Sequence, residues 1–89
     1  MNAFVSVLGM DKKGIIKEVS SILSDTSINI LDINQSIVQG YFTMVMFVDL
    51  NDMTIELNML KRALDEIADK LQLKIKVQHE DIFNAMHKI

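Results

Sequence analysis

Cysteine and proline are both absent from this sequence of 89 residues, and glycine occurs only three times. Without cysteine the chain has no disulfide, no zinc–thiolate site and no thiol nucleophile, a composition typical of cytoplasmic proteins. Without proline-rich or glycine-rich stretches, nothing in the sequence resembles a linker between domains. We therefore expect one cytoplasmic domain over residues 1–89.

A basic cluster and a long apolar run are also lacking. Twelve acidic and nine basic side chains are scattered along the chain and give a net charge of −3, so a nucleic-acid partner is not expected. No apolar run approaches the roughly 18 residues that cross a bilayer, and the N-terminus has no basic export signal. We expect no membrane partner.

Apolar residues, in contrast, are abundant, because they make up 49% of the chain. A domain this small buries only part of its surface when it folds alone. This much apolar surface therefore favours a homo-oligomer, with a homodimer as the simplest case.

The first half of the chain alternates strand and helix patterns. Residues 3–8 read as a buried strand, and a helical stripe follows Gly14, with Asp11 as its expected N-cap. Residues 28–38 read as a strand whose alternation slips once, which predicts a β-bulge. The helical stripe consists of Ile15, Ile16, Val19, Ile22 and Leu23.

A tight hairpin at Gln39 and Gly40 is expected to lead into a strand over residues 41–48. Both faces of that strand are largely apolar, although an antiparallel strand usually has one wet face. Either the second face of the sheet or a neighbouring edge is therefore expected to be covered by another subunit. The even-numbered face consists of Phe42, Met44, Met46, Val48 and Leu50.

The second half repeats the pattern. A helix with apolar spacing from Leu57 to Leu71 is expected to be capped by residues 51–54, and residues 73–77 alternate as a strand. Lys74 and Lys76 suit a sheet edge that must resist pairing. Residues 81–88 predict a short C-terminal helix.

This order of elements predicts an α+β fold, the ferredoxin-like βαββαβ sandwich. Its four-stranded antiparallel sheet should have strand order 4-1-3-2, with two helices on one face. The fold alone does not choose a function.

The loop from Gly9 to Ile15 is the most informative stretch. It runs into a helix N-terminus, whose free N–H groups favour a carboxylate, while Asp11 suits an ammonium group. The positive helix N-terminus and the negative Asp11 side chain match the two opposite charges of an α-amino acid. From the residues alone, the alternative that Asp11 only caps the helix stays open.

The loop also resembles a known pattern. Gly9-x-Asp11-x-x-Gly14-Ile15, followed by Thr26-Ser27-Ile28-Asn29-Ile30-x-Asp32, is similar to the ACT domain motif. The similarity covers the whole chain and is strongest to short, free-standing ACT proteins of bacteria and archaea, which are related to the glycine-cleavage repressor type. One departure is Lys13, where many ACT domains have proline.

The resemblance implies a non-catalytic regulatory dimer, with ligand sites at the subunit boundary formed by the first loop and the start of the second strand. It implies no cofactor. Transferred by position, the ligand-binding residues are Gly9, Met10, Asp11, Lys12, Lys13, Gly14, Ile15, Asn29 and Ile30. Asn29 has a second reading, a left-handed turn before the strand.

Other site types lack their residues. The chain has no cysteine pair for a metal chaperone, and its one arginine, Arg62, lies within a helix and not in the phosphate-binding loop of an acyl phosphatase. The aromatic residues Phe4, Phe47 and Tyr41 are not accompanied by the basic residues of an RNA-binding sheet. His79 and His87 have no matched third metal ligand.

Two functions from different classes remain. The first is an allosteric homodimer that binds an amino acid or a similar small molecule and signals to a protein partner that the sequence does not identify. The alternative is a ligand-independent interaction module. The polar row of Asp32, Asn34, Gln35 and Ser36 suits either an interface pocket or a solvated strand face.

Overall fold

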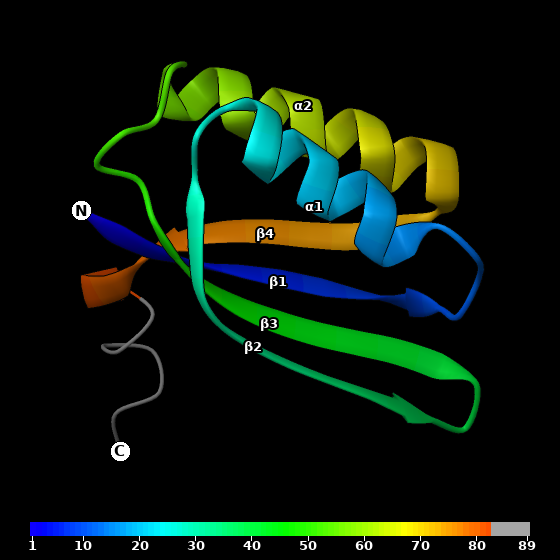
Figure 1. The fold of residues 1–89 in the computed structure, drawn as a ribbon. Helices are drawn as coiled ribbons and strands as arrows, with labels where there is room; N and C mark the ends of the chain where they lie inside the picture. The colour runs from blue at the N-terminus through cyan, green and yellow to red at the C-terminus, as the bar shows by residue number, and fades with distance from the viewer. Residues whose placement is uncertain (83–89) are drawn as a thin grey trace.

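The computed structural model describes residues 1–82 and has the predicted order of strands and helices (Figure 1). The predicted bounds are correct to within two residues at each end of every element. The elements are β1 (Asn2–Met10), α1 (Ile15–Asp25), β2 (Asn29–Val38), β3 (Tyr41–Asp49), α2 (Leu57–Leu71) and β4 (Leu73–His79).

The four strands form one antiparallel sheet in the order β2-β3-β1-β4, which is the predicted order read from the other edge. Both α1 and α2 pack on one face of this sheet, here called the helix side (Figure 1), and the opposite face is called the open face. The ferredoxin-like fold is therefore confirmed. A helical turn covers residues 80–82, and the rest of the predicted C-terminal helix lies outside the described residues.

The core lies between the sheet and the helices. It follows from period-two alternation in the strands and three- or four-residue spacing in the helices. The largest fully buried side chains are Val5, Val7, Val19, Leu23, Met44, Met46, Val48, Leu60 and Leu64. The even-numbered apolar face of β3 is thus the core face.

Neither predicted helix cap is formed. Asp11 is not the N-cap of α1, because two lysines intervene and Gly14 occupies that position with a φ of 90°. Residues 51–54 do not cap α2 either, since α2 begins later and its N-cap is Glu56, which makes no side-chain hydrogen bond. Both predictions were wrong because a cap is set by where the backbone turns helical, and a suitable side chain nearby is not enough.

The hairpin that joins β2 to β3 is confirmed. Gln39 and Gly40 have φ values of 56° and 80°, which is the pair of positive angles that a two-residue type I′ turn requires. The predicted bulge is also present, because the register shifts between Ile30 and Asp32 and leaves Leu31 unpaired.

Strand β2 forms the outer edge of the sheet, and every residue from 31 to 38 is exposed. The bulge sets its two faces. Ile33, Gln35 and Ile37 pair with the core-facing residues of β3 and so lie on the helix side. Asp32, Asn34 and Ser36 therefore lie on the open face of the sheet.

Candidate functional site

An exposed hollow of about 370 Å³ lies between the β1–α1 loop and β2. Asp11 comes from the loop, Ile16 from the first turn of α1, and the remaining residues come from β2 and β3. The lining residues are Asp11, Ile16, Gln35, Ser36, Ile37 and Phe42.

Three local features hold the loop beside this hollow. Gly14 takes a left-handed conformation that a side chain would disfavour. The backbone N–H of Asp11 donates to the carbonyl of Gly40 at 2.9 Å, which ties the loop to the β2–β3 hairpin. Lys12 Nζ donates to the backbone carbonyl of Leu71 at the end of α2.

Hydrogen-bond donors and an acceptor lie near the hollow: the first N–H groups of α1 and the carboxylate of Asp11. The first intrahelical bond of α1 runs from the N–H of Glu18 to Gly14, so the N–H groups of Ile15, Ile16 and Lys17 have no partner within the helix. They lie at the positive end of the helix dipole. The Asp11 side chain is exposed, and within residues 1–82 its carboxylate has no hydrogen-bond or ion-pair partner.

The sequence-predicted loop residues have different surroundings. A Cβ on Gly9 would lie 2.6 Å from Leu73 Cδ2 and 3.2 Å from the Gln72 carbonyl, so close packing against β4 favours glycine there. Met10 points to the open face of the sheet, opposite Tyr41 in the β1–β3 register. Ile15 is 2% exposed, and therefore only its backbone can reach a ligand.

Asn29 and Ile30 lie at the other end of α1. They border a separate hollow with Ser20, Ser24 and Ser27. Because α1 has 11 residues, this end lies about 16 Å from the loop. One chain therefore does not bring the two predicted groups together. The left-handed residue before β2 is Ser27, with a φ of 59°, so that alternative role of Asn29 was wrong.

Sequence reasoning missed the β2 side of the hollow. Gln35 appeared only as one of a polar row, whereas the structure places it on the helix side and its neighbours on the open face. Ile16 was counted in the core stripe of α1, but it is 41% exposed. A search for apolar residues without a partner on an edge strand would have identified this surface.

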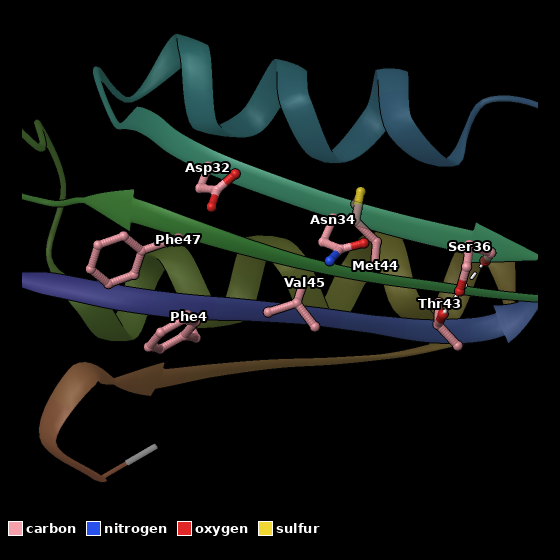
Figure 2. A pocket seen from close by; sticks show the side chains of 8 residues that line it. All are labelled: Phe4, Asp32, Asn34, Ser36, Thr43, Met44, Val45 and Phe47. Atoms are coloured by element: carbon pink, nitrogen blue, oxygen red, sulfur yellow. Dashed lines mark hydrogen bonds between the residues drawn. The ribbon is translucent and has the colours of Figure 1, made fainter. Parts of the chain in front are cut away.

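A second hollow, of about 440 Å³, lies on the open face (Figure 2). The hydroxyl groups of Ser36 and Thr43 are 2.9 Å apart and hydrogen-bonded. The rings of Phe4 and Phe47 pack at a centroid distance of 4.8 Å. The lining residues are Phe4, Asp32, Asn34, Ser36, Thr43, Met44, Val45 and Phe47.

Metal binding has no support in the part of the chain that the structure describes. Within residues 1–82, no three His, Cys, Asp or Glu side chains gather closely enough to hold an ion. His79 pairs instead with Asp81, at 3.7 Å between Nδ1 and the carboxylate. In the same range, no helix is both long and apolar enough to cross a bilayer.

Known proteins with a similar sequence match this chain from end to end. A UPF0237 protein of Clostridium perfringens is 51% identical over 89 residues, which is the full length of both chains. A UPF0237 protein of Methanocaldococcus jannaschii is 41% identical over 85 residues and covers 96% of this chain and 94% of its own.

Solved structures agree with these matches. An ACT domain protein from Streptococcus pneumoniae superposes with a TM-score of 0.79 at 34% identity, over 98% of both chains. The regulatory subunit of aspartate kinase from Thermus thermophilus, at 18% identity and a TM-score of 0.65, shares the fold over 86% of this chain and 50% of its own. The ACT domain profile matches residues 3–78. The chain therefore belongs to the ACT domain family, whose members are generally regulatory domains that bind small molecules.

Proposed function

We propose that this protein is a cytoplasmic, non-catalytic regulator that binds an amino acid as a homodimer, at the hollow between the β1–α1 loop and β2. One observation carries the proposal: the Asp11 carboxylate, which has no partner within residues 1–82, and Ile16 of the first turn of α1, whose N–H is unbonded within the helix, line the same hollow. An α-amino acid has an ammonium group for Asp11 and a carboxylate for the amides of α1. Ile37 and Phe42 supply apolar contacts for a side chain.

The homodimer rests on the exposed edge of the sheet. Ile33 and Ile37 are 43% and 60% exposed on the helix side of β2, and Ile16 on α1, which is also exposed, lines the same hollow as Ile37. The outer backbone groups of an edge strand are free to pair with another strand. A second copy placed along β2 would cover these apolar side chains and complete the hydrogen bonds.

Such a dimer explains why the predicted site residues lie apart in one chain. In a two-fold dimer with antiparallel β2 strands, the start of one β2 lies beside the end of the other. Asn29 and Ile30 of the partner subunit would therefore approach the hollow that Asp11 and Ile37 border. The proposed site combines the loop from Gly9 to Ile15 of one copy with Asn29 and Ile30 of the other.

Binding would regulate through the dimer. A ligand that contacts both subunits favours one arrangement of them by its differential affinity for that arrangement. The exposed edge also fits the alternative, an interaction module that binds a protein partner without any ligand. The two functions differ in whether a small molecule stabilises the protein.

Thermal unfolding in the presence of each amino acid tests the proposal. At one hundred times its dissociation constant, a ligand adds about 2.7 kcal/mol to the free energy of unfolding and raises the Tm. Asp11→Asn should remove this shift and leave the fold intact, because Asp11 makes no cap bond to α1. Asp25→Asn, an exposed acid at the other end of α1, is the matched control.

Two outcomes would contradict the proposal. If no amino acid raises the Tm, the ligand-independent module is favoured. If Asp11→Asn and Asp25→Asn retain the same shift, the ligand binds elsewhere. Sedimentation of the unmodified protein tests the homodimer separately.

A further inference from the structure

The open face of the sheet carries a cluster of acidic and aromatic side chains that is not part of the proposed amino-acid site. In the strand register, Asp32 of β2 pairs with Phe47 of β3, and Phe47 pairs with Phe4 of β1. These three side chains therefore form one row across three strands. Figure 2 shows them on the open face of the sheet around the hollow of about 440 Å³, a volume within the range of small-molecule pockets.

Carboxylates lie on two sides of Phe47. Asp32 is its cross-strand neighbour, and Asp49 lies two residues further along β3 on the same face. Each of them uses one oxygen locally: Asp32 Oδ1 accepts from the N–H of Ile33, and Asp49 Oδ1 accepts from the N–H of Asn51, both at 2.9 Å. The other oxygen of Asp32 is left for an occupant of the hollow.

Within residues 1–82, the lysines of this face lie far from that corner, whereas the N-terminal ammonium of Met1 lies nearer and donates to Asn51 Oδ1. Lys74 and Lys76 are on β4, which is three strand spacings, or about 14 Å, from β2. That distance exceeds the screening length of about 8 Å at physiological salt. The carboxylates of Asp32 and Asp49 together outweigh the single charge of the Met1 ammonium, so the corner around Asp32 and Phe47 is locally negative and favours a cation.

The floor of the corner is apolar and largely aromatic. Phe4 and Phe47 pack at 4.8 Å with their planes tilted by 40°, and Val45 continues the surface toward Thr43. An aromatic ring packs well on such a surface, and a cation near the face of phenylalanine is attracted by its π electrons. The Asn34 amide lies beside Val45 in the register and adds a polar contact.

We propose that this hollow is a second binding site, which takes a small aromatic amine in its protonated form. The ammonium group would bind Asp32, and the ring would lie on Phe47 and Val45. This site is distinct from the proposed amino-acid site, because it lies on the open face of the sheet and the other hollow lies on the helix side of β2; Ser36 is the one residue that lines both hollows.

Titration of the ¹⁵N-labelled full chain with phenethylamine, followed by NMR, tests this proposal. Amide signals of Phe47, Val45 and Asn34 should shift in a saturable manner. Two control compounds separate the contributions of the ring and of the positive charge. The first, 3-phenylpropionate, keeps the ring but has a negative charge, and the second, propylamine, keeps the positive charge but lacks the ring. Both should bind more weakly than phenethylamine.

Asp32→Asn removes the charge and keeps the shape of the side chain, and it should raise the dissociation constant of phenethylamine about fivefold, as expected for an exposed ion pair. Asp25→Asn and Asp11→Asn should leave that constant unchanged. A binding curve for phenethylamine that Asp11→Asn alters would place it in the amino-acid site and overturn the second site.

Three further results would overturn it. The first is the absence of saturable shifts on the open face, and the second is equal binding of phenethylamine and 3-phenylpropionate. The third is movement of the Phe47 and Val45 signals with protein concentration alone, which would mean that a second copy of the chain occupies this face.

Discussion

The two edge strands of the sheet, β2 and β4, differ in how well their apolar surface and unpaired backbone are protected from other chains. Within residues 1–82, both are antiparallel strands with no further strand on their outer side. On β4, Lys74 and Lys76 point to the open face, and α2 covers the helix side, where Leu73 is 7% exposed. On β2 there is no lysine, and Ile37 at a helix-facing position is 60% exposed.

The contrast shows which edge is built to pair. Charged side chains on an edge strand discourage association, and helix cover removes its apolar surface. Strand β4 has two lysines and helix cover, whereas β2 has one charged residue, Asp32, beside the bulge, and its isoleucines on the helix side are exposed; β2 is also longer, with ten residues against seven. A monomer gains nothing from leaving β2 apolar, so the difference between the edges supports the proposed dimer along β2.

The largest effect is expected from truncating the helix-facing side chain of each edge. Leu73→Ala should lower the free energy of unfolding by about 2–4 kcal/mol, because it leaves a cavity in the core. Ile37→Ala should cost less than about 0.5 kcal/mol in dilute protein, because the side chain is already exposed. Urea unfolding at low protein concentration measures both. Equal losses would show that the two edges are equally covered within one chain.

Placing a lysine on β2 should make this edge resist association, as the lysines of β4 are expected to do. Ile37→Lys is expected to raise the dissociation constant of the homodimer about tenfold or more, because two charges would enter an apolar contact. Sedimentation velocity over a range of concentrations measures this constant. The matched control is Met59→Lys, a residue of α2 that is 53% exposed and distant from β2. A similar loss in both variants would point to a general effect of charge.

The smallest effect concerns how β2 is attached to β3, the strand with which it pairs. The side chains of Ser36 and Thr43 share a hydrogen bond at 2.9 Å across β2 and β3. Ser36→Ala should reduce the free energy of unfolding by about 0.5–1 kcal/mol, and Ser36→Thr, which keeps the hydroxyl, should reduce it less. Urea unfolding checks both. If the two substitutions cost the same, the hydroxyl pair contributes nothing to the attachment of β2.

The fold was predictable because alternation along the strands and the helical stripes report burial directly. The alternating apolar face of β3 and the slip in the pattern near Leu31 led to the correct sheet and bulge. The helix caps were not predictable from residue type, because Asp11 is displaced by the left-handed Gly14. Local preferences of about 1 kcal/mol yield to loop geometry.

The candidate site was predictable only on its loop side. The glycines and Asp11 are close in sequence, so the β1–α1 loop could be recognised as a unit. Contacts between distant residues left no such signal: Lys12 bonds to Leu71, which is 59 positions away, and the hollow beside Asp11 is completed by Ile37. That Asn29 lies at the far end of α1 follows from the length of the helix, which the motif does not encode.

Because of the bulge at Leu31, the face on which each β2 side chain lies depends more on the number of residues in the strand than on their identity. Loss of Leu31 itself would leave a regular ladder in which Ile30 and Asp32 keep their present faces. Loss of one residue between Asp32 and the hairpin would instead shift every earlier residue of β2 by one position along β3. Asp32 would then pair with Met46 and point to the core side. Single-residue deletions should therefore be tolerated at the bulge and rejected a few positions later.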